Sequence, residues 1–227
     1  MKLYDYVLSA SCYKVRLLAS LLGVRLDTEA VDFHPGRAHR SPSFRALNPA
    51  GTLPVLVDGD LVLTESTAML VYLAQGHGPD WAGDATPAEA ARTQNWLGFA
   101  ARLGASLGLA RLHDVLHTPA DIDAARAEGT QCLREVEASL AERRFHGALW
   151  LVADHPTIAD IACFPNVALA PDGGVPLDLY PSIRLWMRAL RALPGFVEMP
   201  GIHRLHELRP APEPETTPET APMAALT

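Results

Sequence analysis

The spacing of apolar residues changes once along this chain, and that change constrains the fold more than any other feature. Over residues 1–76, short alternating segments interchange with apolar positions three and four residues apart, which is typical of strands that alternate with helices. After Gly76-His77-Gly78-Pro79 only long helical periodicities remain. We therefore predict an α/β domain at 1–77 with the element order βαβαββα, followed by an all-helical domain at 85–207.

Turn and capping residues place the elements of the first domain. Asp58-Gly59 separates two apolar segments and predicts a hairpin. Ser41 before Pro42 predicts a helix start, because serine caps the helix and proline has no amide hydrogen to leave unpaired. The expected elements are strands at 3–7 and 25–31, helices at 12–22 and 41–47, a hairpin around 58–59 and a helix at 65–74.

Similar signals divide the second half of the chain. Thr86-Pro87-Ala88-Glu89 and Thr157-Ile158-Ala159-Asp160 each place an acidic residue three positions after a threonine, which favours a helix start. The expected helices run from 86 to about 116, from 120 to about 145, from 157, and from 181 to about 193. Residues 208–227 consist mainly of Pro, Glu, Thr and Ala, and we expect this tail to be disordered because it lacks apolar surface to bury.

Composition excludes several classes of function. The formal charge of −7 argues against nucleic acid as the main partner, because binding to phosphates needs clustered Lys and Arg. The chain has no signal segment and no long uncharged apolar run, so we expect a cytoplasmic protein without a membrane partner. The three cysteines, Cys12, Cys132 and Cys163, share no metal-ligand spacing, and we predict no metal site.

The segment 48–56 predicts a site for a peptide-like ligand. Pro54 has no backbone N–H and restricts Leu53 to an extended conformation. The peptide groups of Leu53 are therefore free to pair with another extended chain. Thr64-Glu65-Ser66 then opens a helix next to the same strand pair, which brings an acidic side chain and a helix start to the loop.

Four marks in this order resemble the cytosolic glutathione S-transferases over residues 1–205. They are the segments 9–16, 48–56, 64–66 and 157–160. The first of them is similar to the serine-type motif of the zeta and theta classes, including bacterial members. The resemblance implies a thioredoxin-like N-terminal domain before the helical domain, and a homodimer with a role in detoxification. It also implies that glutathione is the co-substrate and that a small hydrophobic electrophile is the second substrate.

The resemblance also implies which hydroxyl meets the glutathione sulfur. The matching residue is Ser9, and Ser11 is a competing candidate that could share or replace its role. A hydrogen-bond donor beside a helix start would favour the thiolate, since a free thiol with a pKa near 8.5 is mostly protonated at neutral pH. Cys12 could form a mixed disulfide with glutathione or could simply pack in the core.

Further positions match the family's contacts to the rest of glutathione. Leu53, before a proline that the family makes cis at Pro54, would pair its backbone with the cysteinyl unit. Glu65 would take the γ-glutamyl ammonium, while Ser66 and the helix start would take the adjacent carboxylate.

The glycyl end and the second substrate are less defined in the sequence. His39 and Thr52 match positions that hold the glycyl carboxylate in related classes. The pocket for the electrophile should lie between the end of the first strand and the first helices of the second domain. Its candidate residues are Val7, Leu8, Phe99, Arg102, Leu103, Ser106, Arg111 and His113.

The leading hypothesis is a glutathione transferase that directs the glutathione thiolate at a hydrophobic electrophile. A glutathione-dependent isomerase, dehalogenase or disulfide reductase is the alternative among enzymes. A non-catalytic glutathione-binding protein with the same fold is the alternative outside them, because a fold alone does not determine activity.

Overall fold

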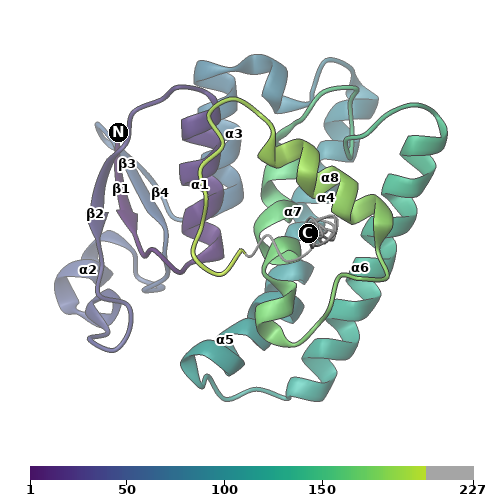
Figure 1. Cartoon of the computed structure of the whole chain (residues 1–227). Coiled ribbons are helices and arrows are strands. Elements are labelled where there is room, and N and C mark those ends of the chain that lie inside the picture. Colours follow the sequence, from purple (N-terminus) through teal and green to yellow (C-terminus); the bar gives the residue numbers. More distant parts are fainter. Residues whose placement is uncertain (203–227) are drawn as a thin grey trace, which may run out of the picture.

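The N-terminal domain is built on a four-stranded mixed sheet with the strand order β2-β1-β3-β4 (Figure 1). The computed structural model describes residues 1–202, and the tail at 208–227 lies outside them. Strand β1 runs parallel to β2 and antiparallel to β3, and β3 pairs with β4 across the predicted Asp58-Gly59 turn. The strands are β1 Lys2–Asp5, β2 Asp27–Ala30, β3 Val55–Asp58 and β4 Leu61–Leu63.

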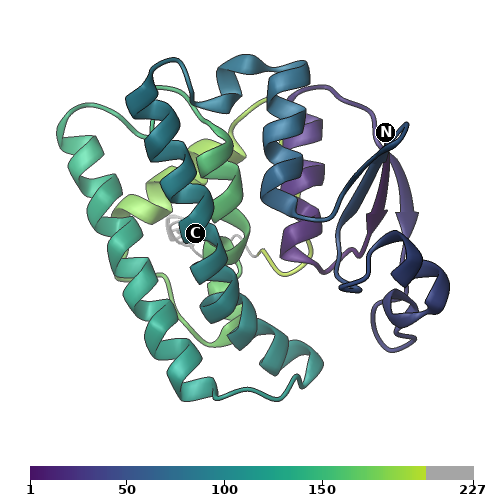
Figure 2. The ribbon, with the colours of Figure 1, turned by 180° about the vertical axis from the view of Figure 1, so that it is seen from behind.

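Alternation along the strands gives each face of the sheet its own partner. Leu3 and Leu56 pair in register and join the main hydrophobic core with α1 and α3, whereas Val55 joins a smaller cluster with Phe44 of α2. Both α1 and α3 therefore lie between the sheet and the helical domain, as Figures 1 and 2 show from opposite sides. These helices are α1 Ala10–Leu21, α2 Pro42–Leu47 and α3 Ser66–His77. The predicted order βαβαββα is confirmed.

The second domain is all-helical, as predicted. Its α-helices are α4 Pro87–Leu103, α5 Leu109–Leu116, α6 Ile122–Phe145, α7 Ile158–Ala168 and α8 Pro181–Arg191. Short 3-10 helices lie at Ala38–Arg40, Pro79–Ala82 and Ala170–Gly173. None of the helices within residues 1–202 is long and apolar enough to span a membrane.

One prediction for this domain is wrong in detail. The sequence favours one unbroken helix from 86 to about 116, but a π-helical segment, Gly104–Gly108, separates α4 from α5. Leu107 in that segment lies directly over Gly129 of α6, where a Cβ atom would come within 2.5 Å of the leucine side chain. The change from α-helix to π-helix therefore occurs where α6 packs against this segment. The periodicity of the sequence does not reveal this contact.

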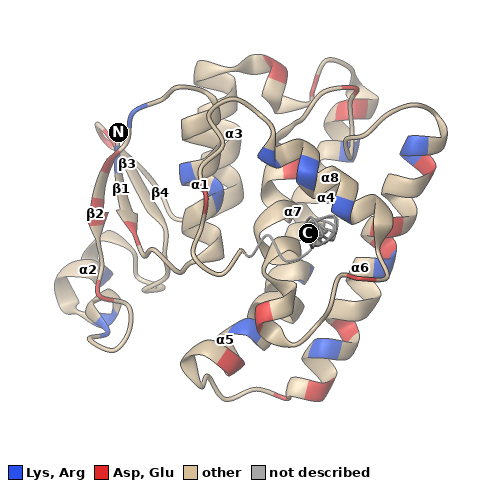
Figure 3. Ribbon diagram, viewed as in Figure 1, with Lys and Arg blue, Asp and Glu red and all other residues tan. Residues whose placement is uncertain are grey.

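Helix α7 is buried along its whole length and packs against both α1 and α4. Such a helix is mostly apolar, unlike α6, which carries acidic and basic residues along its length (Figure 3). The N-terminus of α7 is organised by Asp160. Its buried carboxylate accepts hydrogen bonds from the backbone N–H groups of Leu151 (3.0 Å) and Thr157 (2.9 Å), and from Trp186 Nε1 (2.9 Å).

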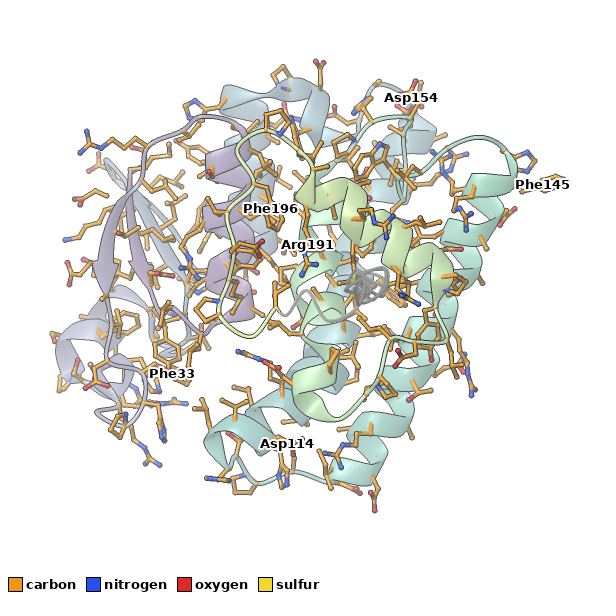
Figure 4. The ribbon with its side chains drawn as sticks, in the orientation of Figure 1. Phe33, Asp114, Phe145, Asp154, Arg191 and Phe196 are labelled. Atoms are coloured by element: carbon orange, nitrogen blue, oxygen red, sulfur yellow. The ribbon has the colours of Figure 1, made fainter. Side chains whose placement is uncertain are left out.

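Replacing Asp160 by Ala should destabilise the protein by roughly 3 kcal/mol, because two buried backbone donors and the Trp186 indole lose their acceptor at once. Urea unfolding followed by circular dichroism would measure the loss. Asp154→Ala is the matched control, since that side chain is 95% exposed and points away from the fold (Figure 4). A loss below about 1 kcal/mol, the size of one ordinary hydrogen bond, would contradict this role of Asp160.

Candidate active site

A cavity of about 420 Å³ opens between the two domains. Its N-terminal wall comes from the β1–α1 loop, the loop before β3 and the start of α3. Its other wall comes from the end of α4, the π-helical segment, α5 and one residue of α7. Six of the predicted glutathione contacts line it, namely Ser9, Ser11, Thr52, Leu53, Glu65 and Ser66. The fold therefore brings together residues that lie as far apart in the sequence as 9 and 66.

Ser9 lies at the start of α1 and also lines the cavity. It is the N-cap of α1, and its Oγ accepts a hydrogen bond from the backbone N–H of Cys12 at 3.2 Å. That bond uses a lone pair of the hydroxyl and not its hydrogen, which can still donate to another acceptor. Ser11 lies in the first turn of the same helix and also lines the cavity.

Asn48 organises the loop that carries Thr52 and Leu53. Its buried side-chain amide donates to the Thr52 carbonyl oxygen (2.9 Å) and Oγ1 (3.0 Å), and its Oδ1 accepts from the N–H of Ala50 (3.1 Å). The peptide bond between Leu53 and Pro54 is cis, as the resemblance implies. Pro54 itself is buried behind Leu53 and does not line the cavity.

The start of α3 faces the cavity without a side-chain cap. Glu65 is the N-cap residue, but its side chain makes no capping hydrogen bond, and Ser66 and Thr67 of the first turn line the cavity with it. The first N–H groups of a helix have no partner within it and attract anions. This helix start can therefore bind a carboxylate while Glu65 binds an ammonium group.

His39 lies one layer behind the cavity. Its ring stacks on Phe33, with centroids 4.2 Å apart, and Phe33 forms part of the cavity wall on the side of α2 (Figure 4). Burial lowers the pKa of His39, and Arg40, Arg37 and Arg45 lower it further, so the ring is neutral at pH 7. The neighbouring Arg40 lines the cavity instead, which sequence spacing in this loop does not predict.

Lys14 is a second basic residue at the cavity. Its side chain is only 4% exposed and lines the cavity. Burial lowers the pKa of Lys14, while the nearby Cys163 and Glu65 oppose that shift. Within residues 1–202, no carboxylate oxygen lies within 4.0 Å of its Nζ.

Of the predicted electrophile-pocket residues, Leu8 of the β1–α1 loop and Arg111 of α5 line the cavity. The residues that do not line the cavity are Val7, Phe99, Arg102, Leu103, Ser106 and His113. Arg102, for example, pairs with Glu128 (2.8 Å) and Glu135 (2.9 Å) of α6. The observed lining residues of α4, the π-helical segment and α5 include Leu97, Ala100, Gly104, Gly108, Arg111, Leu112, Val115 and Leu116. Many of these residues are three or four positions apart, so they lie on one face of a helix. The sequence shows this spacing, but most of the predicted pocket residues lie on another face.

Comparison with known proteins agrees with this geometry. A family model described as the N-terminal domain of glutathione S-transferase matches residues 3–81. Glutathione S-transferase 2 of Anopheles gambiae is 33% identical over 186 residues, which cover 78% of this chain and 84% of that protein. This chain belongs to the glutathione S-transferase family. The recognition made from the four sequence marks is confirmed.

Two further comparisons extend over most of the chain. The maleylacetoacetate isomerase of Pseudomonas aeruginosa is 29% identical over 232 residues, covering 95% of this chain and 99% of that protein. The crystal structure of a glutathione S-transferase from Pseudomonas fluorescens superposes with a TM-score of 0.78 at 29% identity, covering 87% of this chain and 98% of that one. The predicted fold, a thioredoxin-like domain followed by a helical domain, is confirmed, as is the family's use of glutathione as co-substrate.

Metal ligands do not gather anywhere in the described part of this glutathione S-transferase. No group of three His, Cys, Asp or Glu side chains within residues 1–202 is arranged to hold an ion.

Cys12 does not reach the cavity of this glutathione S-transferase. The side chain is buried in the core beneath the α1 N-terminus, and this burial raises the pKa of its thiol to about 12 although the Ser9 hydroxyl acts in the opposite direction. A thiol with that pKa is protonated at pH 7 and is a poor partner for disulfide exchange. Between a mixed disulfide with glutathione and simple packing in the core, the geometry favours packing.

Cys12 should therefore resist alkylation by iodoacetamide at pH 8 in the native protein, because it is both buried and protonated. Mass spectrometry of peptides after a timed reaction would report the modified fraction. The same protein in urea is the control, and there the cysteine should react at the rate of an ordinary thiol. Rapid alkylation of Cys12 in the native protein would contradict its placement.

Proposed function

We propose that the Ser9 hydroxyl donates a hydrogen bond to the glutathione sulfur and stabilises it as a thiolate, which makes this a serine-type glutathione transferase. The observation that carries the proposal is the geometry of Ser9. Its Oγ accepts from Cys12 N–H at 3.2 Å at a helix start that lines the cavity, so the hydroxyl hydrogen is not used by this bond and can turn to donate to an anion in the cavity. Ser11, in the first turn of the same helix, is the secondary candidate.

The magnitude required is within reach of this arrangement. A thiol pKa near 8.5 must fall by about two units for the thiolate to dominate at pH 7, and each unit corresponds to about 1.4 kcal/mol. A hydrogen bond to a charged group contributes about 1.5–3 kcal/mol, and a helix N-terminus adds about 0.3–1 kcal/mol. Ser9 and the start of α1 together account for the shift.

The remaining cavity residues hold the glutathione backbone. Glu65 binds the γ-glutamyl ammonium, Ser66 and the α3 N-terminus bind its carboxylate, and Leu53 pairs with the cysteinyl peptide groups. Thr52 and Arg40 lie where the glycyl carboxylate would end. In this proposal His39, Pro54 and Cys12 support the wall from behind.

The apolar side of the cavity binds the second substrate. The thiolate attacks an electrophilic carbon, a carbon–sulfur bond forms, and the leaving group departs with its electron pair. Leu112, Val115 and Leu116 of α5 form part of this side. The domain at 1–77 thus holds glutathione, and the one at 85–207 holds a small hydrophobic electrophile. By family resemblance the protein is a cytoplasmic homodimer, which size-exclusion chromatography and cell fractionation would test.

A glutathione-dependent isomerase is the second candidate, favoured by the maleylacetoacetate isomerase that matches 95% of this chain. In an isomerase the thiolate adds to the substrate and leaves again, so glutathione is not consumed. Incubation with maleylacetoacetate and with a chlorinated nitrobenzene, while free thiol is followed, separates the two. Conversion of maleylacetoacetate without thiol loss identifies the isomerase, and thiol loss equal to the chloride released identifies the transferase.

Ser9→Ala should lower kcat for a chlorinated nitrobenzene about 100-fold, because the donor to the thiolate is lost, while Ser11→Ala should cost less than about tenfold. Steady-state rates at several pH values would show the difference, and the Ser9 variant should recover at high pH, where the thiol ionises unaided. Full activity of Ser9→Ala together with an inactive Ser11→Ala would reverse the assignment.

Glu65→Gln should raise KM for glutathione about tenfold or more with a smaller change in kcat, since it removes the partner of the ammonium group. A glutathione analogue that lacks the α-amino group provides the control, because Glu65→Gln should bind this analogue as well as the wild-type protein does. Equal losses for both ligands, measured by calorimetry, would show that Glu65 acts only on the fold.

A further inference from the structure

We propose that Arg111 of the helical domain is a positioning residue for Ser9, acting through a hydrogen bond to the backbone of Leu8. The inference rests on the proposed role of Ser9. It assigns to the second domain a part in activating glutathione, in addition to binding the electrophile.

Arg111 reaches across the domain boundary to the peptide unit directly before Ser9. Its Nη1 donates to the carbonyl oxygen of Leu8 at 2.7 Å, although the two residues are 103 positions apart. The arginine is only 6% exposed, so water competes weakly for this bond. The Leu8 carbonyl belongs to the peptide group that joins Leu8 to Ser9. The bond therefore fixes the orientation of this peptide plane and, with it, the position of the Ser9 side chain.

The guanidinium is itself held in place by a second contact. Its Nε lies 3.3 Å from Oδ2 of Asp172, on the short 3-10 helix that follows α7. That helix packs closely on α5, since a Cβ atom at Gly173 would lie 2.8 Å from the backbone nitrogen of Arg111. The fork-shaped side chain therefore bridges a carboxylate of its own domain and a carbonyl of the other.

Other bonds hold the same loop from within its own domain. The N–H of Ser9 donates to the Tyr6 carbonyl at 2.9 Å, and Arg16 Nη2 donates to the Val7 carbonyl at 3.0 Å. Two arginines thus hold consecutive carbonyls, and Arg111 holds the one nearer to Ser9. Val7 is exposed, whereas Leu8 lines the cavity, so the Arg111 bond is the one on the ligand side.

The π-helical segment places Arg111 for this contact. A π-helical turn contains more residues than an α-helical turn and rotates everything that follows it. Gly104 and Gly108, at the two ends of the segment, line the cavity, and Arg111 follows three positions later on the same wall. The interruption of the α4–α5 helix therefore has a consequence for the site, because it sets the direction from which Arg111 approaches Leu8.

The test measures the pKa of the glutathione thiol in the binary complex, from the ultraviolet absorbance of the thiolate, with no electrophile present. Arg111→Met should raise this pKa by about one unit, a roughly tenfold loss of thiolate at low pH, with the Kd of glutathione changed less than about twofold. Arg111→Lys, which keeps a donor, should restore part of the shift. Arg102→Met, an arginine whose partners are Glu128 and Glu135 outside the cavity, should leave the pKa unchanged.

The double variant shows whether Arg111 acts through Ser9. In the Ser9→Ala background, Arg111→Met should add no further shift of the thiol pKa, whereas a general loss of structure would add to it. An additive shift, or a wild-type pKa in Arg111→Met, would overturn the inference while leaving the role of Ser9 intact. If Ser9→Ala alone leaves the pKa unchanged, the proposed function fails first. If Arg111→Met does not fold, the shift in Arg111→Lys and its loss in the Ser9→Ala background decide the question.

Discussion

The buried carboxylate of Asp160 is the interaction on which the rest of the helical domain depends. It joins the start of α7 to the chain at Leu151 and to the indole of Trp186 on α8. A buried carboxylate is costly unless its oxygens are satisfied, and here backbone and indole N–H groups satisfy them. The position of α7, which is buried along its whole length, is therefore set by a polar group in its first turn.

Helix α7 also supports the cavity. The helix packs against α1 on one side and α4 on the other, so both walls of the cavity are built on the same buried element. Ser9 stands at the N-terminus of α1, and the chain leaving α4 leads through the π-helical segment to Arg111. A hydroxyl and a guanidinium from different domains consequently meet at one loop with defined geometry, as preorganised catalysis requires.

The charge of the cavity differs from that of the chain. The protein has a formal charge of −7, yet the described residues that line the cavity include Lys14, Arg40 and Arg111 and one carboxylate, that of Glu65. Figure 3 shows acidic residues spread over many elements, with several along α6. Glutathione brings two carboxylates and one ammonium group, and its thiolate adds a further negative charge. The local excess of cations suits that ligand, because charges facing a partly enclosed cavity are less screened than surface charges.

The sequence by itself determined the element order, the Ser41 and Thr157 helix starts, the Asp58-Gly59 hairpin and six of the residues around the cavity, since local periodicity, capping and turn chemistry act over a few residues. Only the tertiary structure decided that Cys12 and His39 lie behind the wall, that Lys14 and Arg40 reach it, and that the helix after residue 103 turns to present Arg111. Each of these depends on which face of an element meets a distant partner. Segments far apart in the sequence determine burial and contacts such as Leu107 over Gly129 or Arg111 with Leu8. The residues next to each of these positions in the sequence do not determine such contacts.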